Sequence, residues 1–138
     1  DTNCIIYAIN SASPKHDQAK KFLIKEQNDL IIADQNVLEA IRVLTHPKFF
    51  HPMTFPHAEK AVDAIARASQ IITPTRDTLP IALALMRKYT RSANRIFDAY
   101  LVAPMLTHTI SEIATDNERD FRMYKEITVI NPFRSAEN

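Results

Sequence analysis

The chain contains no glycine among its 138 residues. Glycine enters left-handed backbone conformations without steric cost, and it lets a backbone approach phosphate groups closely. The glycine-rich loops of P-loop nucleotide hydrolases and of the common dinucleotide-binding proteins therefore cannot be built from this sequence. Turns must instead be made by proline, asparagine, aspartate and serine. Two large classes of phosphate-handling protein are excluded before any motif is considered.

The length and composition favour one globular domain over residues 1–138. Apolar residues make up 46% of the chain and charged residues 24%, which is typical of a folded protein. No apolar run approaches the roughly 18 residues that span a bilayer, and no signal peptide is visible. The single cysteine, Cys4, cannot form an internal disulfide and suits a small core residue. We therefore expect a cytoplasmic protein.

Hydrophobic spacing predicts both helices and strands. Helices are expected over residues 14–26, 56–69, 77–90 and 97–109, in "QNVLEAIRVLTH" and, as a short turn, in "NERDFRMY". Ser13 and Pro14 are expected to begin the first of these helices as its cap and first residue. Strands are expected at 30–34, 71–75, 110–115 and 127–133. Strands that alternate with helices predict an α/β fold with a central, mainly parallel sheet and helices on both faces.

Acidic residues recur where the predicted strands end and the helices begin. Asp1 precedes the first apolar stretch, Glu39 lies in the helix after strand 30–34, and Asp98 lies near the start of helix 97–109. Asp116 and Asp120 follow strand 110–115. Functional sites of open parallel sheets gather at such junctions. Each acid taken alone is also explained as a helix cap, a solvated surface group or a disordered end.

Carboxylates that are brought together repel one another unless a counter-charge joins them. A hard divalent cation such as Mg²⁺ takes oxygen ligands, polarises a phosphoryl oxygen and lowers the pKa of bound water. Metal-assisted phosphodiester hydrolysis is one use of such a cluster. Mg²⁺ sensing and other phosphoryl-transfer reactions are alternatives that the acids alone leave open.

Five segments, taken in order, resemble the PIN-domain family, and most closely the VapC-type ribonuclease toxins of bacterial toxin–antitoxin pairs. They are "DTNCIIYAIN", "NVLEAIRVLTHPKFF", "NRIFDAYLVAPML", "IATDNERDF" and "ITVINPF". The resemblance implies a three-layer α/β/α PIN-like domain, with a short strand preceding Asp1. It also implies an Mg²⁺- or Mn²⁺-dependent endoribonuclease with an RNA substrate. Its expected partners are a VapB-like antitoxin and a second copy of the chain, with no membrane.

The resemblance assigns roles to individual residues. Asp1, Glu39 and Asp98 match the first three acids of the family, while "TDNERDF" offers Asp116 and Asp120 for the last position. These five acids are expected to bind the metal and to act in catalysis. Supporting roles are implied for Thr2 or Asn3 beside Asp1, and for Thr115 and Asn117 in the last segment.

Other features are open to two interpretations. Arg87, Arg91 and Arg95, with Lys88 among them, either bind RNA phosphates or form a solvated helix face. Three histidines at positions 46, 51 and 57 match no familiar zinc spacing. The leading hypothesis is a metal-dependent ribonuclease toxin. The alternatives are a PIN-like module that binds RNA or protein without cutting, and a Mg²⁺-dependent phosphatase or DNA nuclease.

Overall fold

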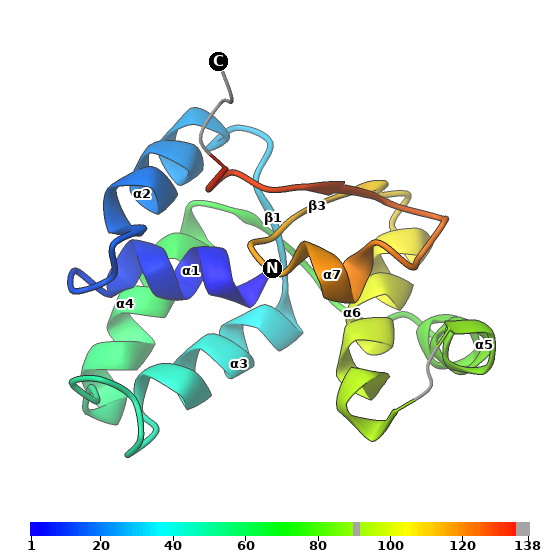
Figure 1. Ribbon diagram of the computed structural model, residues 1–138, viewed down its shortest axis with the longest axis horizontal. Helices are drawn as coiled ribbons and strands as arrows, with labels where there is room; N and C mark the ends of the chain where they lie inside the picture. The colour runs from blue at the N-terminus through cyan, green and yellow to red at the C-terminus, as the bar shows by residue number, and fades with distance from the viewer. Residues whose placement is uncertain (90–91, 135–138) are drawn as a thin grey trace. The chain divides into compact units, whose positions relative to one another are not determined.

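The computed structural model describes residues 1–89 and 92–134 of the chain (Figure 1). It consists of two compact units, which we call the N-terminal unit (Asp1–Ile71, with the segment that begins at Pro132) and the C-terminal unit (Ile72–Asn131). Both units combine helices with short paired strands. The predicted α/β class is confirmed.

The N-terminal unit is built from helices around a short strand pair. Its elements are α1 (Thr2–Ile9), α2 (His16–Lys25), β1 (Ile31–Ala33), α3 (Asp34–Leu44), α4 (Phe55–Arg67) and β2 (Gln70–Ile72), the last at the boundary. Strands β1 and β2 form a two-stranded sheet. The core takes one apolar face from each of α1, β1, α3 and α4, through Ile5, Ile32, Ala40, Leu44, Ala58 and Val62. This packing holds the start of α1 against α3, where two of the candidate acids lie.

The segment after β4 returns to the N-terminal unit. The buried Phe133 ring packs edge-on against Tyr7 of α1, with the ring centroids 5.2 Å apart. Lys15 Nζ lies 5.5 Å from the Tyr7 centroid and 5.6 Å from that of Phe133. A cation over two aromatic faces stabilises this contact. The aromatic pair thus fastens the segment around Phe133 to α1.

The C-terminal unit surrounds one buried helix. Its elements are α5 (Thr78–Tyr89), the 3₁₀ turn η1 (Ala93–Arg95), α6 (Ile96–Thr107), β3 (Glu112–Ala114), α7 (Glu118–Phe121) and β4 (Thr128–Ile130). Helix α6 packs against α5 and is buried along most of its length, as its apolar sequence predicts. Strands β3 and β4 pair in parallel, with Glu112 opposite Thr128 and Ala114 opposite Ile130.

The predicted elements are found, with shifted ends. Helix α2 begins at His16, so the prediction that Ser13 and Pro14 start it is wrong. The Ser13 carbonyl accepts a hydrogen bond from the His16 backbone N–H at 3.1 Å, and its hydroxyl oxygen accepts one from the Lys15 N–H at 3.2 Å. These bonds form a separate turn before the helix. Across the part of the chain that the structure describes, no helix has both the length and the apolar character that crossing a bilayer requires.

Among residues 1–89 and 92–134, two residues adopt the left-handed conformation that glycine usually supplies. They are His51, with φ of 59°, and Thr109, with φ of 58°. Thr109 follows the end of α6, where its N–H donates to the Leu106 carbonyl at 3.2 Å and the Ile110 N–H donates to the Met105 carbonyl at 2.8 Å. This is a Schellman-type helix end, which ordinarily places glycine at that position. A β-branched residue there is strained by about 1–2 kcal/mol.

Replacing Thr109 with glycine is expected to raise the free energy of unfolding by about 0.5–1 kcal/mol, since the relief of strain exceeds the entropy that glycine adds to the unfolded chain. Urea denaturation measures the change. The matched control is Thr107→Gly, two residues earlier at the last position of helix α6, which is expected to lower stability by about 1 kcal/mol. A Thr109→Gly variant that is destabilised like the control would contradict the assignment of strain.

Candidate active site

Asp1 caps helix α1. Its Oδ1 accepts a hydrogen bond from the Thr2 backbone N–H at 2.7 Å, and its Oδ2 accepts one from Asn3 Nδ2 at 3.0 Å. The carboxylate is half-buried and both of its oxygens are oriented. Each carboxylate oxygen has two lone pairs and can accept more than one bond. The capping role considered for Asp1 is therefore compatible with metal binding.

Glu39 lies on α3 and is held from two sides. Its Oε2 accepts a hydrogen bond from Thr2 Oγ1 at 2.8 Å, and its Oε1 accepts one from Gln35 Nε2, one helical turn earlier, at 2.8 Å. The side chain is half-buried although the adjacent Leu38 is exposed. Two donors on one carboxylate restrict its rotation.

Thr2 and Asn36 form a buried polar relay beneath these acids. Asn36 Oδ1 accepts from the Ala33 backbone N–H at 3.1 Å, and Asn36 Nδ2 donates to Thr2 Oγ1 at 3.0 Å. Thr2 is 7% exposed and Asn36 5% exposed. Because an amide nitrogen only donates, the Thr2 hydroxyl hydrogen remains available for Glu39. The relay runs from the end of β1 to the Glu39 carboxylate.

Sequence reasoning located part of this arrangement. Asn3 lies beside Asp1, whereas the hydroxyl of Thr2 binds Glu39 and only its backbone N–H binds Asp1. Asn36 was missed, as was Gln35. A signal for Asn36 exists: it follows strand β1 closely and lies three residues before Glu39, which places both on one face of α3.

In the C-terminal unit, Asp98 lies near the start of a helix and Asp116 follows the end of a strand. Asp98 is in the first turn of α6, where the helix dipole favours a negative charge. Asp116 follows β3 and the fully buried Thr115. The Thr115 N–H donates to the Ile130 carbonyl at 2.9 Å, and its Oγ1 accepts from the Asn117 N–H at 3.0 Å. Thr115 thus fixes the backbone on both sides of the turn that carries Asp116.

Asp120 is bound by two protein donors. Its Oδ1 lies 3.0 Å from Arg95 Nη2, and its Oδ2 accepts from Asn117 Nδ2. The second guanidinium nitrogen, Arg95 Nη1, is shielded from solvent and has no hydrogen-bond acceptor among the described residues. An unsatisfied buried N–H costs about 1–3 kcal/mol. Arg95 is therefore neutralised by Asp120 yet retains an unused donor.

The donor chemistry suits a hard cation. The candidate ligands in both units are carboxylates, and those of Asp1 and Glu39 are oriented by amide and hydroxyl donors, as outer-shell groups orient metal ligands. Among residues 1–89 and 92–134, no three side chains of histidine, cysteine, aspartate or glutamate gather as a metal-binding group. Cys4 is buried in the core, as predicted.

Comparison with known proteins identifies the family. The family model of the PIN domain matches residues 1–127. The chain belongs to the PIN domain family. Ribonuclease VapC24 of Mycobacterium tuberculosis (strains CDC 1551 / Oshkosh and ATCC 25618 / H37Rv) is 27% identical over 142 residues, covering 98% of this chain and 96% of the relative. Ribonuclease VapC48 of the same strains is 27% identical over 141 residues, covering 96% of this chain and 95% of the relative.

The basic stretch of this PIN domain is largely paired where it is described. Lys88 Nζ lies 2.8 Å from Glu126 Oε1, and Arg95 pairs with Asp120. Arg87 is exposed on the last turn of α5. Arg91 lies outside the described residues. The Lys88 contact ties the end of α5 to the segment before β4.

The same ion pair shifts the pKa of both partners. The hydrogen bond to Glu126 and a further one with Tyr89 raise the pKa of Lys88. Partial burial alone would raise the pKa of Glu126. Hydrogen bonds from Lys88, from its own backbone N–H and from Tyr89 outweigh that burial and hold the pKa of Glu126 below its usual value. Ionised Glu126 therefore favours the folded PIN domain.

Replacing Thr2 with valine is expected to lower the free energy of unfolding by about 1–3 kcal/mol, because Asn36 Nδ2 loses its acceptor and Glu39 Oε2 loses a donor in a buried setting. Thr2→Ser keeps the hydroxyl and serves as the matched control, with a loss of less than about 1 kcal/mol. Urea denaturation compares the two. Equal losses in both variants would mean that the methyl group, not the hydroxyl relay, carries the effect.

Glu126→Gln is expected to reduce the fall in the free energy of unfolding as the pH is lowered. A carboxyl whose pKa is lowered by folding stabilises the fold above its unfolded pKa, and this contribution disappears as the pH falls through the folded pKa. Urea unfolding from about pH 7 down to about pH 3.5 measures the slope. The exposed Glu59→Gln on α4 is the control and should keep the wild-type slope. An unchanged slope in Glu126→Gln would contradict this account.

Proposed function

We propose that this PIN domain is a divalent-metal-dependent endoribonuclease that hydrolyses RNA phosphodiesters as the toxin of a toxin–antitoxin pair. The observation that carries the proposal is the buried Thr2–Asn36 relay, which holds Glu39 beside the helix that Asp1 caps. Two buried polar side chains, Thr2 and Asn36, orient the Glu39 carboxylate, and such an arrangement favours a functional role for that carboxylate. Family membership and similarity to proteins named ribonucleases support the reaction class.

The proposed ligands of an Mg²⁺ or Mn²⁺ ion are Asp1, Glu39, Asp98, Asp116 and Asp120. The ion, when bound, polarises a phosphoryl oxygen and lowers the pKa of a bound water. The residues of this chain hold the proposed ligand carboxylates in place. The Thr2 hydroxyl and the Gln35 amide orient the Glu39 carboxylate, and the Asn3 amide orients that of Asp1. No covalent protein intermediate and no histidine base are required.

The last acidic position favours Asp116 over Asp120. Both oxygens of Asp120 already have partners: Oδ1 is ion-paired with Arg95, and Oδ2 accepts a hydrogen bond from Asn117. Removing Arg95 from Asp120 in order to bind a metal would leave a half-buried guanidinium without its partner. Thr115 and Asn117 are proposed to support the Asp116 turn.

The proposed partners come from the family resemblance. They are an RNA substrate, a VapB-like antitoxin that restrains the nuclease, and a second copy of the chain in a homodimer. The proposed location is the cytoplasm. Co-purification of the full chain with the product of a neighbouring antitoxin gene tests the pairing, and loss of RNA cleavage in that complex is the expected result.

Asp98→Asn is expected to reduce RNA cleavage by roughly 100-fold or more, because an amide replaces a charged ligand. The assay follows a labelled single-stranded RNA with Mg²⁺ or Mn²⁺, and with EDTA as the metal-free arm. The exposed Asp29→Asn is the control and should cut at the wild-type rate. Asp116→Asn should resemble Asp98→Asn more closely than Asp120→Asn does.

Two results would overturn the nuclease proposal. Tight RNA binding by the wild-type chain without cutting under any divalent metal would favour a binding module instead. Cutting of DNA or release of inorganic phosphate, with RNA left intact, would favour the third class. A titration of thermal stability with Mn²⁺ separates these cases from failed metal binding, since a bound ion raises the melting temperature.

A further inference from the structure

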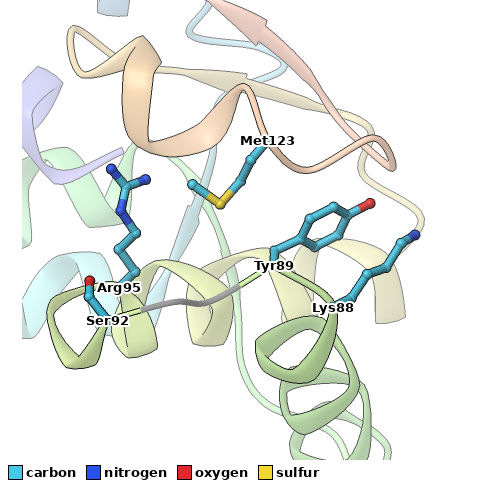
Figure 2. Close-up of a pocket in the computed structure, with 5 residues that line it drawn as sticks. All are labelled: Lys88, Tyr89, Ser92, Arg95 and Met123. Atoms are coloured by element: carbon cyan, nitrogen blue, oxygen red, sulfur yellow. The ribbon is translucent and has the colours of Figure 1, made fainter.

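Two cations of the basic stretch are already bound within the C-terminal unit. Figure 2 shows them at a pocket whose lining residues are Lys88, Tyr89, Ser92, Arg95 and Met123. Arg95 Nη2 lies 3.0 Å from Asp120 Oδ1. Lys88 Nζ lies 2.8 Å from Glu126 Oε1 and 4.8 Å from the centroid of the Tyr89 ring. Either cation would have to leave a carboxylate before it bound a phosphate, so this pocket is a poor contact for RNA.

The part of the chain that joins α3 to α4 has a different charge. Between Glu39 and Glu59 the sequence holds no aspartate or glutamate, whereas it holds Arg42, Lys48 and three histidines. Both cations are exposed, and neither has an ion-pair partner among residues 1–89 and 92–134. A positively charged surface without acids attracts a polyanion. Charge complementarity therefore favours a nucleic acid as the ligand of this segment.

The α3–α4 loop, which we define as residues 45–54, is fixed to the N-terminal unit at two points (Figure 1). The Phe49 N–H donates to the His46 carbonyl at 2.8 Å, and the Met53 N–H donates to the Leu44 carbonyl at 2.8 Å. The side chains of Phe49 and Met53 pack against the hydrophobic core. The three residues between them are exposed. The loop thus has a fixed base and presents its tip to solvent.

Phe50 lies outside the core at the tip of this loop. Its ring is 69% exposed, and its centroid lies 4.1 Å from that of the His51 ring. The backbone of His51 is left-handed, with φ of 59°, a conformation that few residues other than glycine adopt. An exposed aromatic ring forgoes the stabilisation of burial, and a strained backbone costs free energy. The coincidence of the two at one loop tip points to a role in binding.

We propose that the α3–α4 loop binds single-stranded RNA, with a base stacked on Phe50 and a phosphate at Lys48. The identification of the polyanion as RNA rests on the proposed function. Stacking on an aromatic ring tolerates every base, so the contact would supply affinity for unpaired strands without selecting a sequence. The loop follows α3, in which a rise of 1.5 Å per residue puts Leu44 about 7–8 Å along the axis from Glu39. A strand bound at the loop would thus extend along α3 toward a candidate metal ligand.

The test uses a fluorophore placed in the loop of the full chain. The protein contains no tryptophan, so Phe50→Trp introduces a single indole there, and a base stacked on that indole quenches its fluorescence. The titrations are made in EDTA with an unstructured single-stranded RNA, with a duplex of the same length and with inorganic polyphosphate. The matched control is Ile24→Trp, at a position on α2 that is 62% exposed.

Single-stranded RNA is expected to quench Phe50→Trp saturably and to leave Ile24→Trp unchanged. The duplex and polyphosphate should quench less, because duplex bases already stack on one another and polyphosphate has no bases. Lys48→Gln, added to Phe50→Trp, should weaken binding and reduce the slope of log K against log salt concentration by about 0.7. Lys20→Gln, at an exposed position on α2, is the charge control and should keep the slope.

The native aromatic residue is tested by fluorescence anisotropy of the labelled RNA with otherwise unaltered protein. Phe50→Ala is expected to bind about fivefold or more weakly than the wild type, since stacking on the ring is lost. Because Phe50 is exposed, the melting temperature of the variant should stay near that of the wild type, which separates lost binding from lost folding.

The absence of saturable quenching in Phe50→Trp, or equal quenching in Ile24→Trp, would overturn the proposal. So would unchanged RNA affinity in Phe50→Ala, or a salt slope that Lys48→Gln leaves unchanged. The assays contain no free metal, so their outcome is independent of catalysis. Quenching by RNA without cleavage under Mg²⁺ or Mn²⁺ would contradict the nuclease proposal alone, and cleavage without quenching would contradict the loop proposal alone.

Discussion

The hydroxyl group of Thr2 is the contact on which the arrangement of the N-terminal acids depends. It has one hydrogen to donate, and Asn36 Nδ2, which only donates, occupies an acceptor position on its oxygen. The hydrogen therefore goes to Glu39. Because the side chains of Thr2 and Asn36 are buried, the loss of one of these hydrogen bonds leaves polar groups unpaired where water cannot replace the partner. The relay thereby fixes α1 to α3 through a polar contact of defined direction.

The C-terminal unit uses a threonine in a related way. Thr115 is fully buried, extends the β3–β4 pairing by one backbone bond, and accepts from Asn117 through its hydroxyl. In both units a buried threonine next to an aspartate in sequence anchors the backbone that carries the acid. The two units differ in the charge of the groups that hold their acids. Asp120 is paired with the charged Arg95, whereas Glu39 accepts hydrogen bonds from the neutral side chains of Thr2 and Gln35.

The local pattern of the sequence was enough to predict the strands and the α-helices from α2 onward, because hydrophobic periodicity records which face is buried, but it did not predict helix α1. It failed at the start of α2, where Ser13 and Pro14 fit a helix cap and a turn equally well, and the bonds to His16 and Lys15 favour the turn. The local pattern could not predict hydrogen bonds between polar residues that are far apart in the sequence. Asn36 and Thr2 are 34 residues apart, and nothing in the composition marks an amide as buried. The pairing of Arg95 with Asp120 is long-range in the same sense.

The lack of glycine links the strain in the fold to the ways in which this chain can bind a phosphate. A chain without glycine places threonine and histidine in left-handed conformations, as at Thr109 and His51. It also lacks the close backbone approach by which many proteins surround a phosphate with N–H groups. Phosphate recognition must then rely on side chains and on bound cations.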